Sequence, residues 1–265
     1  MYTLPRRPGS IGQVLDAAVM LFKASFKAVL PFSIVAAVLA LAPIIVQLLG
    51  VSANRVEPTV ANLEQSRSPL YWGVVGISIC VSLINYAALM VRAESIARGA
   101  KVTNGAALAI ARRRSFILLL VVVCFLIVLA LGLILLVIPG LILLISMSMY
   151  SMAIVLDGKG IESLGYSHSL VWGNWWRTSA LLTVGGIVVY VMFLMVDLVV
   201  VLVAQVLALD PVTQFMILFL SNAFVTLLTT PFLNALMLEI YRDLKLRKEG
   251  GDLDERLTAL GPATV

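Results

Sequence analysis

The chain has 265 residues, of which 61% are hydrophobic and only 12% are charged. This balance excludes an ordinary soluble domain and predicts an all-α integral membrane protein. The net charge of +5 does not indicate nucleic-acid binding, because basic residues beside membrane spans set the topology and meet anionic lipid head groups.

The N-terminal region predicts a capped helix followed by a membrane span. Ser10 and Gln13 fit a capping box, which begins a helix. Its apolar and polar residues fall on opposite faces, so we expect it to lie in the cytoplasmic interface of the membrane. Pro31 follows, and the first span is predicted at about residues 29–50.

The next segments predict a second span, a second interfacial helix and a hairpin. The second span covers about residues 69–91, and the helix begins after Thr103. It ends in a dense basic anchor for the third span: Arg112, Arg113 and Arg114. Residues 115–156 carry no charge and are interrupted by Pro139-Gly140, which predicts spans at 115–138 and 141–156 joined by a tight turn. The fourth span is short, and whether it crosses the bilayer fully stays open.

The last third of the chain predicts a third interfacial helix and two more spans. Residues 160–176 form that helix, and its end is typical of the aromatic belt at a membrane interface: Trp172, Trp175, Trp176 and Arg177. Spans five and six cover about 178–207 and 212–240. The remaining residues, 242–265, form a charged cytoplasmic tail that begins as a continuation of span six.

Charge and repetition together define the expected topology. All but Arg55 and Arg67 of the 19 Lys and Arg residues fall on one side of the spans, which predicts cytoplasmic termini in the cell inner membrane. Ser10, Thr103 and Lys159 each stand five residues before a leucine, a weak threefold repeat. The expected fold is one domain, residues 1–241, with six transmembrane helices as three hairpins, each preceded by a cytoplasmic amphipathic helix.

Both ends of the chain resemble one family of membrane proteins. Residues 10–18 with Phe22 and Phe26, and residues 241–253, are similar to the opening and closing segments of the glycerophosphoryl diester phosphodiesterase membrane domain. Residues 157–164, Trp176-Arg177 and the break at residues 138–140 resemble its internal features. The resemblance implies a six-span fold without an assigned activity. The phosphodiesterase activity belongs to a separate soluble barrel that uses two histidines and a divalent metal, whereas this chain has one histidine, His168.

The sequence predicts no catalytic residue, metal site or cofactor. Hydrolysis or phosphoryl transfer needs a metal cluster, a nucleophile with its base, or a phosphate-binding loop. None of these patterns occurs, so we expect a protein that is not an enzyme. Gly185-Gly186 lies in an apolar span, where it favours close helix packing.

Polar residues inside the spans are the candidate ligand contacts. They are Asn85, Tyr86, Asp197, Asn222, Thr226 and Asn234. The amides bond between helices in one interpretation and line a polar path between spans two and six in the other. Asp197 faces the bundle interior or lies near the outer interface, about 29 Å along the helix from Arg177.

Two functional classes follow from these patterns. The favoured one is an envelope protein that organises lipid or partner proteins, with anionic head groups contacted by Arg112, Arg113, Arg114, Arg177 and the three tryptophans. The alternative is a small transporter of a lipid-like or amphiphilic solute. A homo-oligomer or a membrane-protein partner is compatible with both. The cytoplasmic acids are expected to pair with Lys and Arg or to form a docking surface: Asp16, Glu94, Glu162, Glu239 and Asp243.

Overall fold

The computed structural model describes residues 2–54 and 69–259, and every regular element in these two ranges is a helix. Six segments are long and apolar enough to cross a membrane: Ile11–Ala42, Pro69–Ala97, Asn104–Leu135, Val137–Val155, Trp175–Val206 and Thr213–Gly250. The chain is therefore a multi-pass membrane protein. Arg55, Arg67 and the last six residues of the predicted tail lie outside the described residues.

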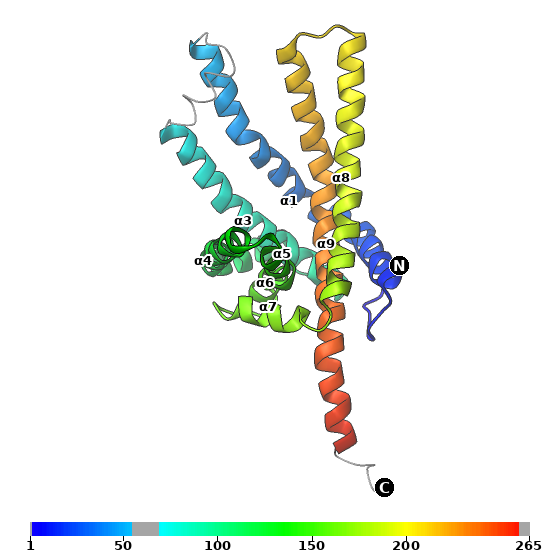
Figure 1. The fold of residues 1–265 in the computed structure, drawn as a ribbon. Coiled ribbons are helices and arrows are strands. Elements are labelled where there is room, and N and C mark those ends of the chain that lie inside the picture. Colours follow the sequence, from blue (N-terminus) through cyan, green and yellow to red (C-terminus); the bar gives the residue numbers. More distant parts are fainter. Residues whose placement is uncertain (1, 55–68, 260–265) are drawn as a thin grey trace.

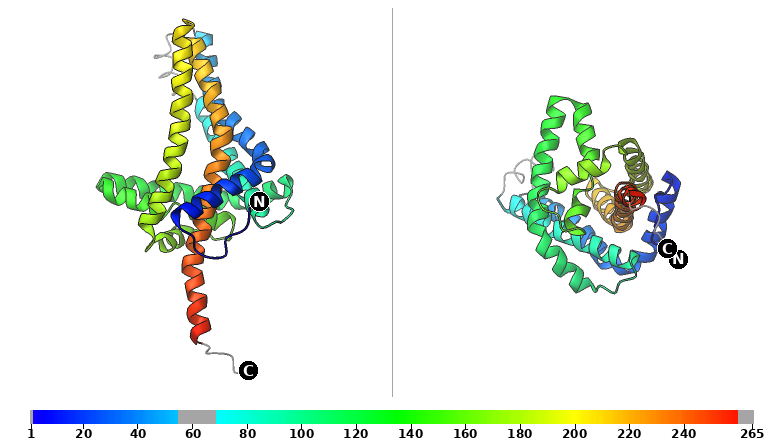
Figure 2. Two further views of the ribbon diagram at one scale, coloured as in Figure 1. Left: turned by 90° about the vertical axis from the view of Figure 1, so that its right-hand side faces the viewer. Right: turned by 90° about the horizontal axis from the view of Figure 1, so that it is seen from below.

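The first hairpin consists of α1 (Ile11–Asn54) and α3 (Pro69–Ala97). The predicted capping box is confirmed, since the Ser10 amide donates to Gln13 Oε1 at 2.7 Å and the Gln13 amide donates to Ser10 Oγ at 3.3 Å. The helix does not end at Pro31. It bends (Figure 2), because a proline lacks the amide hydrogen and crowds the preceding turn, while buried Val29 and Phe32 hold both sides in place.

The second hairpin consists of α4 (Asn104–Leu135) and α5 (Val137–Ser146). Thr103 caps α4 by accepting from the Ala106 amide at 3.2 Å. The helix runs on through the three arginines, so the expected second interfacial helix is not a separate element. The predicted turn at Pro139-Gly140 is wrong, because the chain reverses at Leu136 (φ −163°, ψ 140°). Pro139 lies in the first turn of α5, where its missing amide hydrogen would have no helical acceptor.

Short elements connect this hairpin to the last one. The predicted fourth span is divided, since α5 ends at Ser146 and α6 covers only Tyr150–Val155. Next comes α7 (Ser163–Val171), and a turn through Gly173 leads into α8 (Trp175–Val206). The last helix, α9 (Pro211–Ala259), is continuous through Pro231 and through the predicted boundary at residue 241. The tail thus begins as a continuation of span six.

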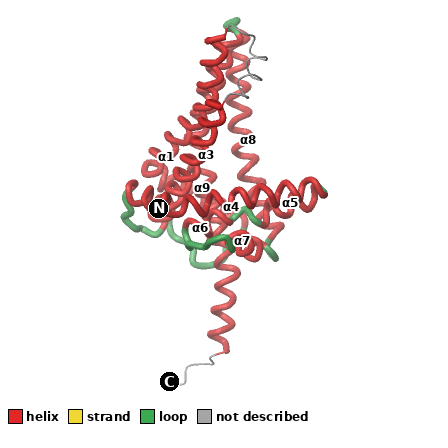
Figure 3. The backbone as a smooth tube through the Cα atoms, turned by 90° about the vertical axis from the view of Figure 1, so that its left-hand side faces the viewer, coloured by secondary structure: helices red, strands yellow, loops and turns green. Residues whose placement is uncertain are grey.

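The helices converge in the middle of the molecule, close to the N-terminal end of α1, and the last part of α9 projects beyond them toward one end (Figure 1). From there α1, α3, α8 and α9 extend to the opposite end, whereas α4 and α5 run across them (Figure 3). The core lies where these directions converge, and its fully buried side chains include Leu21, Leu89, Met90, Met152 and Ile240. The outer half of α8 leaves its apolar side chains exposed, as expected for a surface that faces lipid.

Gly185 is the point of close approach between α8 and α9. A Cβ atom added there would lie 2.1 Å from Leu236 Cδ2, whereas one added at Gly186 would meet nothing within 4 Å. We expect Gly185→Leu to lower the free energy of unfolding by about 1–3 kcal/mol through overpacking. Gly186→Leu, the matched control, should change it by less than about 0.5 kcal/mol. Thermal unfolding in detergent checks this, and equal effects of the two changes would contradict the assigned contact.

Candidate functional site

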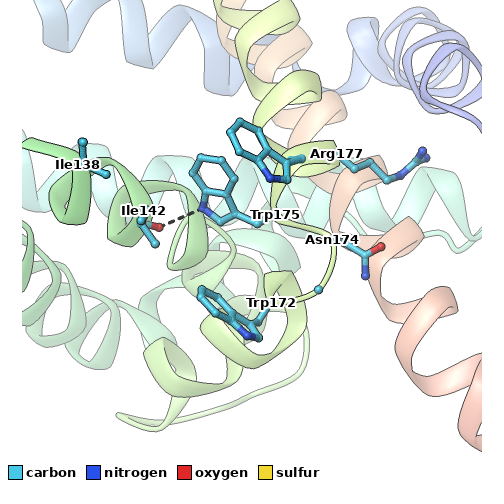
Figure 4. A pocket seen from close by; sticks show the side chains of 8 residues that line it. Ile138, Ile142, Trp172, Asn174, Trp175 and Arg177 are labelled. Atoms are coloured by element: carbon cyan, nitrogen blue, oxygen red, sulfur yellow. Dashed lines mark hydrogen bonds between the residues drawn. The ribbon is translucent and has the colours of Figure 1, made fainter.

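A hollow of about 660 Å³ opens between α5, the turn after α7 and the first turn of α8. We call it the tryptophan pocket (Figure 4). Its lining residues are Ile138, Ile142, Trp172, Gly173, Asn174, Trp175, Trp176 and Arg177. Most of this lining is apolar, so the pocket suits a hydrocarbon group better than a polar solute.

The three tryptophans have different roles in the pocket wall. Trp175 is fixed, because its Nε1 donates to the Ile142 carbonyl at 3.3 Å (Figure 4). Its ring packs edge-on against that of Trp176, with centroids 4.8 Å apart. Trp176 and Trp172 are 81% and 58% exposed. Two large amphipathic rings therefore stand at the mouth, where a membrane interface would stabilise them.

The turn into α8 gives the pocket a polar edge. Gly173 has a φ of +92°, a conformation that favours glycine. Asn174 precedes the helix without a side-chain cap. The first amides of α8 have no helical acceptor, so their partial positive charge lies beside the apolar wall.

The predicted arginine contacts do not gather at this pocket. The Arg177 side chain points away from the tryptophans (Figure 4) and donates to Asp243 Oδ2 at 3.0 Å and to the Gly9 carbonyl at 2.7 Å. Arg114 donates to the Gly158 carbonyl at 3.2 Å. Arg112 and Arg113 are exposed on α4.

A second polar centre, which we call the ion cluster, lies where α3 meets α9. Arg242 contacts the carboxylates of Glu94 and Glu239 together. Those two residues are only 8% and 2% exposed. The Tyr2 hydroxyl donates to Glu239 Oε1 at 2.6 Å. Burial raises the pKa of Tyr2 above its usual range; the charge of Arg242 opposes this shift, and the hydrogen bond to Glu239 adds to it.

The N-terminal arm, residues 2–9, is fastened to α9 beside the ion cluster. The Gly9 amide donates to Asp243 Oδ1 at 2.9 Å, and the Gly9 carbonyl accepts from Arg247 at 2.7 Å. Asp243 also accepts from Arg247 Nε at 2.9 Å. The structure thus confirms ion pairing with Lys or Arg for Glu94, Glu239 and Asp243. It joins the tail to the arm, an arrangement that sequence spacing did not specify.

Two further acids make different contacts. Asp16 is exposed on α1. Glu162 accepts from the Gly160 amide at 2.7 Å, which lowers the pKa of this carboxyl group. On α7, burial raises the pKa of Tyr166 to about 12, and a hydrogen bond to Glu249 is the second cause of this rise.

The predicted polar residues of the spans fall into separate groups. Asn222 Nδ2 donates to Asp197 Oδ1 at 2.8 Å, and Thr226 Oγ1 donates to the Asn222 carbonyl at 2.9 Å. Asn85 Nδ2 instead donates to the Phe32 carbonyl of α1 at 2.8 Å. Asp197 therefore has a partner on the neighbouring helix, and these amide contacts join helices in pairs.

The remaining two predicted polar residues lie deeper. Asn234 is fully buried on α9, and its amide group lies within reach of the Tyr86 hydroxyl on α3. Tyr86 packs against the core from α3.

Comparison with known proteins gives one family. The family described as "Domain of unknown function (DUF7847)" matches residues 70–244, about two thirds of the chain. The chain belongs to this DUF7847 family. No curated protein and no solved structure gives a significant match. The match names a different family from the phosphodiesterase membrane domain that the two ends resemble.

The DUF7847 match covers the tryptophan pocket and the carboxylates of the ion cluster, but it leaves out the arm and α1. Within the part of the chain that the structure describes, no group of three His, Cys, Asp or Glu side chains is placed to hold a metal ion. The features that stand out in this DUF7847 member are thus an aromatic pocket and a buried ion cluster.

Proposed function

We propose that the protein is a non-enzymatic component of the cell inner membrane that binds and organises lipid on the cytoplasmic side. The observation that carries the proposal is the tryptophan pocket, an apolar hollow of about 660 Å³ with two exposed indole rings at its mouth. Indole rings favour the boundary between lipid head groups and acyl chains. An acyl chain fits the apolar wall, and a head group fits the polar edge made by Asn174 and the first amides of α8.

The charge pattern supports both the orientation and the choice of lipid. Exposed Arg112 and Arg113 precede the uncharged residues 115–156. Basic residues at this position are retained in the cytoplasm and attract anionic head groups. We therefore place both termini in the cytoplasm and name an anionic phospholipid as the ligand class. The N-terminal part of α1 before its bend and the short α7 would lie in the same interface.

The resemblance of the two chain ends to the phosphodiesterase membrane domain agrees with this proposal. Some members of that family are fused to the catalytic barrel, which is a separate soluble part. A membrane domain of that kind supports a role in holding lipid or a partner rather than in cleaving a substrate.

The alternative is transport of a lipid-like or amphiphilic solute. The observation that favours it is the Asp197–Asn222 contact, since an ionisable group inside a span often marks a solute pathway. A transport assay separates the two functions. A transporter moves labelled lipid across a proteoliposome membrane, whereas an organising protein does not.

Removing the two exposed rings tests the pocket. Phosphatidylglycerol added to the protein in detergent at a hundred times its Kd should stabilise the fold by about 2.7 kcal/mol. The double variant Trp172→Ala/Trp176→Ala should lose most of this shift in Tm, because the mouth of the pocket is gone. Trp72→Ala is the matched control, since this ring is 60% exposed on α3, away from the pocket lining. The proposal fails if the double variant keeps the lipid-dependent shift, or if Trp72→Ala loses it equally.

A further inference from the structure

The hairpin of α4 and α5 does not follow the direction of the other long helices. It runs across α8 and α9 (Figure 3) and projects sideways from the remaining helices when the molecule is viewed along α9 (Figure 2). Its two limbs are locked together, because a Cβ added at Gly140 would lie 2.4 Å from Leu133 Cδ2. The two limbs are therefore closely packed beside the tip of the hairpin at Leu136.

Two contacts define the depth of that tip. Ile142 of α5 accepts from Trp175, the first residue of α8, and Ile138 lines the same pocket as Gly173 and Asn174. The tip at Leu136 is six residues from Ile142, or about 9 Å along a helix. The hydrocarbon core of a bilayer is about 30 Å thick. If α8 crosses the bilayer from Trp175 onward, the tip cannot reach the far side.

The surface of the hairpin requires hydrocarbon around it. Residues 115–156 carry no charge, and the tip is highly exposed, with Ile134 and Ile138 at 81% and 71%. A helix that is apolar all round belongs in a lipid or protein interior. The turn is also compatible with lipid, because the Leu136 amide donates to the Gly132 carbonyl at 3.1 Å and the Leu136 carbonyl accepts from the Gly140 amide at 3.3 Å.

We propose that α4 and α5 form a re-entrant hairpin embedded in one leaflet, the cytoplasmic one, whose acyl chains cover its exposed sides. The chain then crosses the membrane four times, through α1, α3, α8 and α9. Both termini stay on the same side, so the charge pattern is satisfied. Only the choice of leaflet rests on the proposed orientation, and the lipid bound in the tryptophan pocket plays no part in the argument.

Cysteine accessibility tests the hairpin in the full chain. With both native cysteines replaced (Cys80→Ala and Cys124→Ala), Leu136→Cys is introduced in one variant and Leu207→Cys, at the turn between α8 and α9, in another. In right-side-out vesicles a membrane-impermeant maleimide should label Leu207→Cys and leave Leu136→Cys unlabelled. Depth-dependent quenching of a fluorophore attached to Leu136→Cys should place it in the cytoplasmic half of the bilayer.

Labelling of Leu136→Cys from outside at a rate similar to that of Leu207→Cys would overturn the proposal. Quenching that places the tip in the outer half would overturn it too. Failure of Leu207→Cys to label from outside would instead contradict the orientation. Ile134→Cys, at an exposed position near the end of α4, provides a second site if Leu136→Cys does not fold.

Discussion

Replacing Arg242 by leucine should lower the free energy of unfolding by about 3–5 kcal/mol. Arg242 is the cation between Glu94 and Glu239, and both of these residues are buried. Without it, two carboxylates remain in a desolvated site, and their other partners among the described side chains are Tyr2 and the exposed Arg98. Unfolding in detergent, followed by tryptophan fluorescence, measures the loss.

Arg98 provides the matched control for this change. It pairs with the same Glu94, but its side chain is 66% exposed. Arg98→Leu should therefore cost less than about 1 kcal/mol. Adding Glu94→Gln to Arg242→Leu should restore part of the stability, because one uncompensated charge is removed. A loss below 1 kcal/mol for Arg242→Leu would contradict the role of the ion cluster.

Replacing Asp243 by alanine should cost about 2–4 kcal/mol and release the N-terminal arm. Asp243 is 5% exposed and accepts from Arg177, Arg247 and the Gly9 amide. Its removal takes the paired carboxylate from two guanidinium groups and the hydrogen-bond acceptor from the Gly9 amide. Hydrogen exchange should then show faster exchange of the Gly9 amide than in the unchanged protein.

Asp243→Asn should have a smaller effect than Asp243→Ala, because its side-chain oxygen still accepts from the Gly9 amide. Asp16→Ala, an exposed change on α1, should leave both stability and exchange of the arm unaltered. Unchanged exchange at Gly9 in Asp243→Ala would show that the arm is held by other contacts.

Local patterns in the sequence predicted most of the helices but not all of their ends. Capping by Ser10 and Thr103 and the long uncharged stretches were sufficient to place the helix starts and the apolar segments. Pro31 and Pro139 did not mark helix ends, because a proline is compatible with a helix end, a bend or a first helical turn. The interruption at residues 147–149 carries no glycine or proline, so no local signal marked it.

The functional features depend on contacts between distant residues, which periodicity does not encode. Arg242 meets Glu94 across 148 positions, and Tyr2 meets Glu239 across 237. Charge signs alone indicated that the acids and bases beside the spans pair, but not which acid pairs with which base. The sequence indicated that the three tryptophans are interfacial. It did not predict the pocket, because the pocket forms only where α5 lies against the start of α8.

Native mass spectrometry of the protein extracted gently from its own membrane tests the central claim most directly. The account predicts an anionic phospholipid retained at fixed stoichiometry by the unchanged protein and by Trp72→Ala, and lost from Trp172→Ala/Trp176→Ala. An unchanged protein without lipid, or equal retention by the double variant, would contradict lipid binding at the tryptophan pocket.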